Sequence, residues 1–210
     1  MGTKISALTA DTAPTFDDLV ATVTDPAGTP ASRKVTLGNL SQGLGGRLEL
    51  PISASLVPLT GSSAALEYVE SSGAGTYKPS WVQLRYDATS DEARMWNFVA
   101  NQPMGTPVLK VLYYMASANV SKAVVFAAQL ACISDTDTSV TAKVFDTANS
   151  ATTTVPDAAG TEDEMSITLT NNSSIAVGDR VCLVLYRDAD NGSDTASGDC
   201  VVTGVRIIYA

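Results

Sequence analysis

The chain has 210 residues, of which 45% are hydrophobic and 17% are charged, and its formal net charge is −9. An acidic chain whose longest cationic run is Arg33-Lys34 lacks the basic surface needed to bind nucleic acid or an anionic membrane. The sequence contains no histidine, which excludes His-based catalytic triads and His metal ligands.

The first 46 residues carry their own turn signals and are predicted to form a small N-terminal segment. The expected elements are a short helical turn near Phe16–Leu19, a strand at Val20–Thr24, a turn at Asp25–Pro30, a strand at Arg33–Thr36 and a short helix from Leu37. About 45 residues bury little surface alone. We therefore expect this segment to need a partner surface or further copies of itself.

Residues 47–77 differ from the flanking segments in composition: Ser, Ala, Gly and Pro are frequent, and apolar residues do not recur with a regular period. The segment includes Pro51, Pro58, Gly61, Gly73 and Gly75. This composition is typical of extended chain between folded parts. The sequence therefore predicts a linker over residues 47–77.

From residue 78 onward, apolar and polar residues alternate in short runs separated by turn signals. Strands are predicted at Trp81–Tyr86, Arg94–Val99, Val108–Met115, Val140–Val144, Thr152–Val155, Met165–Thr170 and Val201–Tyr209. Val124–Ile133 is apolar on both faces except for Gln129, and Val181–Tyr186 is similar. Such a strand is either central and covered on both faces or placed at a subunit interface.

Eight or nine strands without a convincing helix, in about 130 residues, are typical of an antiparallel sandwich, and the count fits a jelly roll. The predicted fold class is therefore all-β. We expect an antiparallel jelly-roll-like β-sandwich over residues 78–210 with a small N-terminal extension over residues 1–46.

The cysteines Cys132, Cys182 and Cys200 are odd in number, which does not suggest a disulfide framework. In a hairpin across the Asp188–Asp199 loop, Cys182 and Cys200 would be offset by roughly 15 Å along the strand. A disulfide needs Cα atoms within roughly 7 Å. We therefore expect three free, mostly buried thiols in a protein assembled in a reducing cytoplasm.

The Asp-rich loop Asp188–Asp194 has some features of a calcium-binding loop, since hard cations need several oxygen ligands. Its spacing departs from that of an EF-hand, because Gly192 is fifth rather than sixth and Asp199 replaces the final Glu. Asp, Asn and Gly also favour turns. A solvated hairpin loop is the prediction, and calcium binding stays open.

Two further groups are candidate sites of chemistry. Glu162-Asp163-Glu164 offers paired carboxylates for glycoside hydrolysis, but neighbouring strand residues point to opposite faces, so an acidic loop before Met165 is favoured. Cys182 has no base to activate it as a nucleophile. The sequence therefore predicts no catalytic, cofactor-binding or metal-binding residues, and no enzyme.

The two tryptophans are the candidates for stacking against a sugar ring. Trp81 lies opposite the apolar face formed by Val82, Leu84 and Tyr86, so it is the candidate for an exposed or interfacial aromatic residue. Trp96 is expected to pack in the core or at its edge.

The N-terminal segment resembles a short module of tailed-phage structural proteins that attaches tail-fibre, tail-spike or head-fibre domains to the particle. The matching pieces are Lys4–Leu8, Asp18–Val20, Asp25–Thr29 and Lys34–Leu40. The C-terminal part resembles a phage β-sandwich module through Leu84–Ala93, Val108–Tyr114, Val124–Leu130, Gly178–Arg187 and Asp194–Tyr209. It departs from that module at the turn Gln102–Gly105 and at Phe126, where Trp is common.

This resemblance implies a virion protein, made in the host cytoplasm, whose N-terminal segment docks on another virion protein such as the major capsid protein. Modules of this kind tend to be homotrimers, so the resemblance also implies a homotrimer. Capsid decoration or a head fibre is favoured over a tail fibre, because the chain is short and lacks long repeats.

Two alternatives remain. A receptor- or glycan-binding module at a tail tip would expose aromatic residues beside polar loops. A carbohydrate-active enzyme would require two carboxylates facing each other across a groove, roughly 5–9.5 Å apart.

Overall fold

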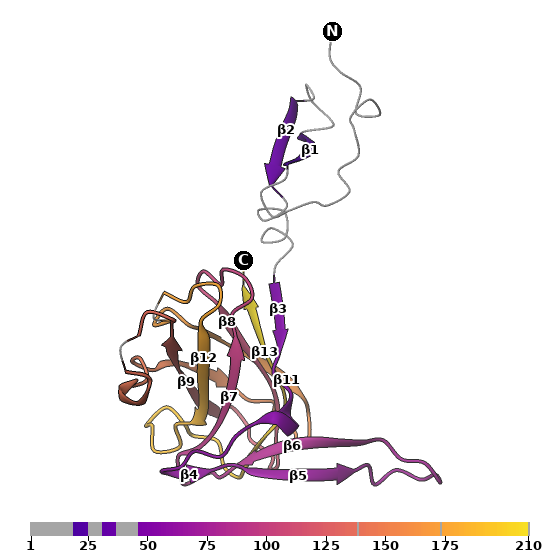
Figure 1. The fold of residues 1–210 in the computed structure, drawn as a ribbon. Coiled ribbons are helices and arrows are strands. Elements are labelled where there is room, and N and C mark those ends of the chain that lie inside the picture. The colour runs from indigo at the N-terminus through magenta and orange to yellow at the C-terminus, as the bar shows by residue number, and fades with distance from the viewer. Residues whose placement is uncertain (1–18, 25–30, 37–45, 138, 173, 210) are drawn as a thin grey trace. The chain divides into compact units, whose positions relative to one another are not determined.

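The computed structural model describes residues 19–24, 31–36, 46–137, 139–172 and 174–209 (Figure 1). The chain divides into two compact units, residues 1–46 and residues 47–209. In the first unit, β1 (Leu19–Thr24) and β2 (Ala31–Thr36) form an antiparallel hairpin in which Leu19 lies opposite Thr36. The two strands predicted in this segment are present. The helix expected from Leu37 lies outside the described residues, as does the helical turn near Phe16–Leu19, apart from Leu19 in β1.

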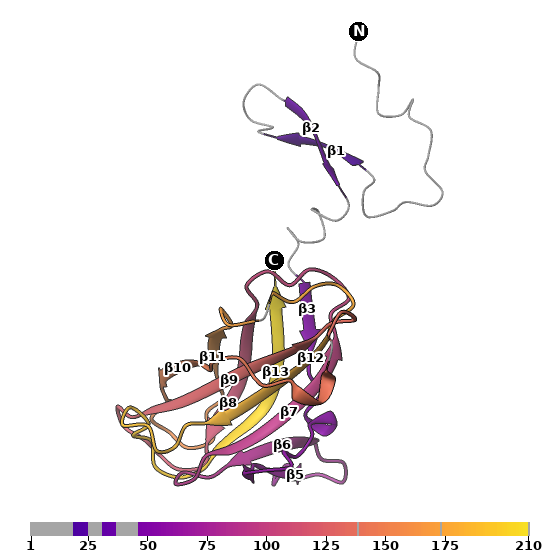
Figure 2. The ribbon, with the colours of Figure 1, turned by 60° about the vertical axis from the view of Figure 1, so that its left-hand side comes forward.

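The second unit consists of two sheets built from short strands. The strands are β3 (Gly46–Glu49), β4 (Ser62–Ser63), β5 (Ala65–Glu70), β6 (Ser80–Tyr86), β7 (Glu92–Val99), β8 (Val108–Met115), β9 (Ala123–Ile133), β10 (Asn149–Thr154), β11 (Asp163–Thr168), β12 (Arg180–Arg187) and β13 (Cys200–Tyr209). The first sheet has the order β11-β8-β13-β6-β5, with β3 also pairing with β13, and the second sheet has the order β10-β9-β12-β7-β4. Figure 2 shows β9, β12 and β7 of the second sheet side by side.

The strand order is that of a jelly roll. Strands β6, β13, β8 and β11 form one antiparallel row, and β7, β12, β9 and β10 form the other. The chain therefore crosses repeatedly between the sheets, which is how a jelly roll wraps two Greek keys around one core. The predicted all-β jelly-roll sandwich is confirmed.

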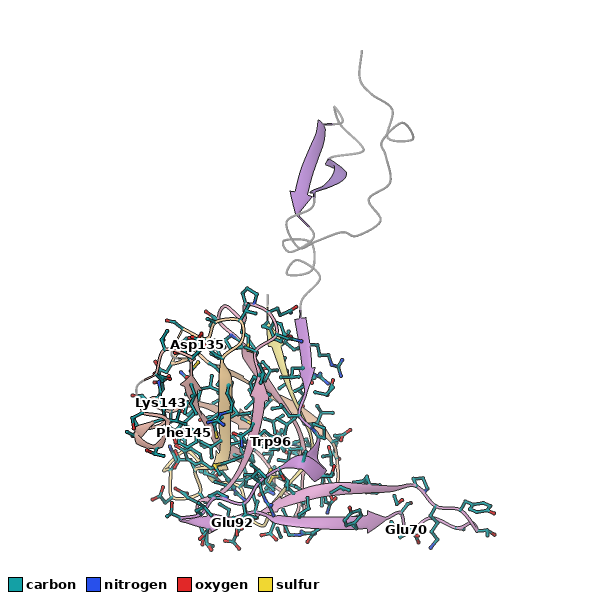
Figure 3. The ribbon with its side chains drawn as sticks, in the orientation of Figure 1. Glu70, Glu92, Trp96, Asp135, Lys143 and Phe145 are labelled. Atoms are coloured by element: carbon teal, nitrogen blue, oxygen red, sulfur yellow. The ribbon has the colours of Figure 1, made fainter. Side chains whose placement is uncertain are left out.

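The core lies between the inward faces of the two sheets. Burial alternates strictly along β8, as expected for a strand with one core face and one outer face. At the centre the rings of Tyr86 and Phe126 meet edge to face, with centroids 5.2 Å apart. Trp96 is 2% exposed and its Nε1 donates to the Pro51 carbonyl at 2.9 Å, so its polar atom is satisfied within the core (Figure 3).

Residues 47–77 are not the linker that their composition predicts. Their first part forms β3, a 3-10 turn at Ile52–Ala54, β4 and β5. Leu50, Ile52 and Ala64 are buried in the core of the sandwich. The Pro and Gly residues end very short elements here, and the few apolar side chains between them suffice to fasten the segment to the sheets.

Two details of the predicted strands are wrong. Val140–Val144 alternates by composition, but the structure has a 3-10 turn at Val140–Ala142, because β10 occupies the edge of β9 instead. In β13 a register shift between Val202 and Gly204 inserts a bulge. As a result Val202, not Val201, belongs to the core cluster with Val205.

Strand β9 occupies the central place that its two apolar faces indicated. It pairs with β10 on one side and β12 on the other, and its residues Val124–Ala128 are all buried. In the part of the chain that the structure describes, no helix has the length and apolar character to cross a membrane.

A two-stranded arm leaves the body of the sandwich. Figure 1 shows β5 and β6 running outward together beyond the other strands. We call residues 65–86 the β5–β6 arm. Beyond the last ladder pair, Glu70 opposite Ser80, the Ser71 amide donates to the Pro79 carbonyl at 2.8 Å, and residues 72–78 form the tip.

Candidate functional site

A buried glutamine organises the outer face of the first sheet where the arm begins. Gln83 of β6 is 1% exposed. Its Oε1 accepts hydrogen bonds from Trp81 Nε1 and from the Tyr114 hydroxyl, both at 3.0 Å. Its Nε2 donates to Glu67 Oε2 at 2.8 Å. One amide thus fixes the orientation of two aromatic rings and of a carboxylate from a neighbouring strand.

An ion pair extends this network along the base of the arm. Arg85 Nε donates to Glu67 Oε1 at 2.8 Å, and Arg85 Nη1 lies 3.6 Å from Asp199 Oδ2. The hydrogen bond from Arg85, followed by that from Gln83, lowers the pKa of the Glu67 carboxyl below its usual value. The outer face of the arm base is therefore polar, connected and rigid.

Beside this network the sheet is hollowed. A depression of about 280 Å³ is lined by Trp81, Tyr114, Gly160, Glu162 and Thr203. Thr203 Oγ1 donates to Glu162 Oε1 at 2.6 Å, which fixes a carboxylate at the rim. We call this feature the Trp81 depression. Its volume is close to the lower end of the range for small-molecule sites, so it suits a single small ring.

The tryptophans lie where the strand pattern predicts. Trp81 is 39% exposed on the outer face, and Trp96 is in the core. An exposed indole fixed by its N–H offers a flat apolar face, and the Glu162 carboxylate beside it accepts hydrogen bonds from hydroxyl groups. Tyr114, Glu162 and Thr203 complete the depression from other strands and loops. Because strand pairing alone brings them together, no local sequence signal identifies them.

The acidic run at residues 162–164 is not entirely the loop expected from sequence. Asp163 and Glu164 belong to β11, and only Glu162 precedes the strand. Asp163 Oδ2 accepts a hydrogen bond from the Tyr113 hydroxyl at 3.1 Å. Glu164 pairs with Lys110 at 3.1 Å and with Arg206. Glu162 is hydrogen-bonded to Thr203, so the three carboxylates have separate protein partners. Together with Leu112 and Arg206 they line a depression of about 350 Å³.

The Asp188–Asp194 loop separates into two parts with different surroundings. Carboxylate oxygens of Asp188 and Asp190 lie within 4.8 Å of each other and of one from Asp91, in the turn between β6 and β7. Repulsion from Asp91 is the largest effect that raises the pKa of Asp190. Asp194, by contrast, is buried against Arg187. Asp91 Oδ1 accepts a hydrogen bond from the Ala189 amide, 98 positions later in the chain. Because of this separation, the sequence gives no signal that Asp91 lies beside the loop.

All three cysteines are free, as predicted. The hairpin used to predict this does not form, since β12 and β13 belong to different sheets. Burial, followed by a hydrogen bond to Asp179 Oδ2, raises the pKa of the Cys132 thiol to about 12. Burial also raises the pKa of Cys182 and of Cys200. Each thiol is thus held away from the reactive thiolate form.

A polar depression of about 480 Å³ lies at one end of the second sheet. Cys132 and Asp179 form its floor, and the ion pair between Asp137 and Lys143, 2.7 Å apart, forms part of its wall. Figure 3 shows Asp135, Lys143 and Phe145 near this end of the molecule. Asp135 and Asp137 belong to a turn in which Asp137 accepts the Ser134 amide at 2.8 Å, so a structural role accounts for Asp137.

Comparison with known proteins by sequence finds no match, either to a family model or to a curated protein. Comparison of structures finds similar folds at low identity. The enzymatically active domain of tailspike protein 4 of bacteriophage CBA120 is 9% identical, with a TM-score of 0.40 over 74% of this chain and 19% of that one.

Two carbohydrate-binding proteins are similar at the same level. The endo-1,4-beta-D-xylanase 10B of Clostridium thermocellum is 14% identical, with a TM-score of 0.41 over 78% of this chain and 27% of that one. A module specific for non-crystalline cellulose is 11% identical, with a TM-score of 0.37 over 72% of this chain and 94% of that one. This chain thus spans only a small part of the tailspike and xylanase chains. Likenesses this distant are no guide to function.

Proposed function

We propose that this chain is a non-enzymatic structural protein of a phage virion, attached to the particle through residues 1–46 and presenting the jelly roll. The observation behind this proposal is the division of the chain into a small unit and a complete sandwich with its own core. The strands described in the small unit are a single two-stranded hairpin. Such a hairpin is marginally stable alone, so a docking role suits it.

The resemblance of residues 4–40 to phage attachment modules gives the partner class, another virion protein such as the major capsid protein. The place of action is then the virion, as capsid decoration or a head fibre, and the expected assembly is a homotrimer. The chemistry of the sandwich fits this role. Glu164 and Asp194 are occupied in ion pairs, and the pKa of each thiol is raised.

Attachment is tested with virions of the encoding phage prepared without this chain. The full chain and residues 47–210 are each mixed with the particles and sedimented. We expect the full chain to pellet with the particles and residues 47–210 to stay in solution, with the β-sheet circular dichroism of a folded sandwich. Equal binding of both proteins would show that residues 1–46 are not the anchor.

A second function, binding of a receptor glycan, is favoured by the Trp81 depression. An exposed indole, a tyrosine and a fixed carboxylate around a ring-sized hollow match the needs of a sugar, which has apolar C–H faces and hydroxyl donors. The test is a glycan array probed with the full chain and with Trp81→Ala, with Val177→Ala as a control exposed elsewhere. Binding that only Trp81→Ala loses supports this function, and no binding to any glycan refutes it.

A further inference from the structure

The inner face of the β5–β6 arm begins in the core and ends in solvent. The register places Leu66 opposite Leu84 and Tyr68 opposite Val82, so these four side chains share one face. Along this face the exposed fraction rises from 0% at Leu84 to 38% at Leu66 and 82% at Tyr68. The face is apolar at these four positions and ends in the polar pair Glu70 and Ser80, and the rising exposure shows that only its base is covered.

A two-stranded ribbon whose apolar face is uncovered has low stability in water. Two strands without a third strand or a covering layer are marginally stable, and an open strand edge invites pairing. Strand β5 is the last strand of its sheet among the described residues, so its outer edge is open. The Gln83 network fastens the outer face of the arm base, but it leaves the inner face with Tyr68 bare.

Exposed apolar side chains are concentrated in and just before the arm. The described residues include twelve large hydrophobic side chains that are exposed, and seven of them fall within residues 56–81. These seven are Leu56, Val57, Leu59, Leu66, Tyr68, Tyr77 and Trp81. Trp81 lies on the outer face, whereas Leu66 and Tyr68 are neighbours on the inner face. Single exposed apolar residues are ordinary, but neighbouring ones on a single face indicate an interaction surface.

The charge of this region points to the partner. Residues 56–86 contain Glu67, Glu70, Lys78 and Arg85 and are therefore neutral, so the whole net charge of −9 lies elsewhere in the chain. Two copies of an acidic chain repel each other over most of their surfaces. The electrostatic repulsion between two copies is smallest where the contacting surface of each is neutral and apolar. Glu70 and Lys78 also pair across the arm at 3.5 Å, which leaves no free charge of one sign to select an oppositely charged partner.

We propose that the inner face of the β5–β6 arm, centred on Leu66 and Tyr68, packs against a second copy of this chain. The contact covers the apolar face that the sandwich leaves bare and protects the open edge of β5. It deepens the proposed homo-oligomer by naming its contact surface. It does not involve residues 1–46, so its failure would leave attachment to the particle untouched.

The first test is the solution mass of the full chain by light scattering at about 50 µM, within the range where weak association is detected. For the native chain we expect a mass at least twice the 21.8 kDa of one chain. The control Val144→Ser/Val177→Ser, which alters exposed valines away from the arm, should have the same mass as the native chain. Leu66→Ser/Tyr68→Ser should have the mass of a monomer, 21.8 kDa, with an unchanged circular dichroism spectrum. A monomeric native chain, or a double variant that keeps the native mass, overturns the proposal.

A second test does not depend on how the double variant folds. A photo-crosslinking phenylalanine analogue is placed at Tyr68 in one sample and at Val177 in the other, because both positions are exposed. Irradiation should produce a covalent dimer from position 68 and none from position 177. No dimer from position 68, or equal yields from both positions, refutes the proposed contact.

Discussion

Arg187 and Asp194 form a fully buried ion pair, with side chains that are 0% and 1% exposed. Arg187 donates from Nε to Asp194 Oδ2 at 3.0 Å and from Nη2 to Oδ1 at 2.8 Å, a bidentate geometry. Its remaining donors reach the carbonyls of Ala196 at 3.0 Å and Gly198 at 2.9 Å. The pair thus folds the long connection between β12 and β13 onto the sandwich.

Removing one partner of this pair should be strongly destabilising. Arg187→Met leaves the Asp194 carboxylate buried and unpaired, which costs about 3–5 kcal/mol of unfolding free energy. Arg85→Met is the matched control, because the Arg85 pair is about one third exposed and is expected to contribute about 1 kcal/mol or less. Urea unfolding measures both. Similar losses in the two variants would contradict the buried pair.

The Glu67 network predicts how stability changes with pH. The pKa of Glu67 is lowered in the folded chain, chiefly by Arg85, so its carboxylate stabilises the fold above the usual value of 4.5. As the pH falls below 4.5, the Glu67 carboxylate is protonated in the unfolded chain first. Its contribution to the free energy of unfolding is then lost as the pH falls through the pKa of Glu67 in the folded chain. Glu67→Gln should therefore be less stable than the native chain near neutral pH, with a gap that narrows in acid. Denaturant unfolding over this range tests it, and a constant gap refutes it.

The cysteines should be slow to react in the folded chain. Burial raises the pKa of Cys132 to about 12 and also raises the pKa of Cys182 and Cys200. Alkylation by iodoacetamide at mildly alkaline pH is therefore expected to be slow in buffer and complete at three sites in denaturant. Mass spectrometry counts the modified thiols. Rapid native labelling of any of them would contradict this environment.

Two glycines separate backbone strain from steric clash. Gly198 and Gly160 have nearly the same φ, +76° and +75°. A Cβ at Gly198 would lie 2.4 Å from the Ser117 hydroxyl and 2.9 Å from its Cβ, whereas a Cβ at Gly160 meets nothing within 4 Å. Gly160→Ala should lose about 1–2 kcal/mol from the left-handed conformation alone. Gly198→Ala should lower the stability measured by thermal unfolding clearly more than Gly160→Ala does. Equal losses in the two variants would show that Ser117 moves aside without cost.

Much of the sandwich could be predicted from the sequence because most of its strands have one solvent-exposed face and one core face. Val108–Met115 alternates residue by residue, and β8 alternates in burial in the same way. Val124–Ile133 lacks a polar face and is central in its sheet. The residue pattern does not predict the structure where strand pairing decides it. Val140–Val144 alternates but finds no strand to pair with, and the bulge in β13 exchanges Val201 for Val202 on the core face.

The candidate site was only partly predictable. Trp81 was placed on the outer face from its position relative to Leu84. Gln83 as the common acceptor for Trp81 and Tyr114 depends on the pairing of β6 and β8 with β13, which local sequence does not encode. The composition of residues 47–77 predicts a linker, because short apolar pieces between Pro and Gly have no period. The strands β3, β4 and β5 form in this segment because they pair with strands of the two sheets.

The central claim is that this chain is part of a virion. Quantitative mass spectrometry of gradient-purified particles of the encoding phage tests it most directly, because a structural protein must remain with the particle through purification. The account predicts peptides from both the N-terminal unit and the jelly roll, at a fixed ratio to the major capsid protein across the gradient peak. Absence of the chain from the peak, with recovery in the soluble lysate, would contradict it.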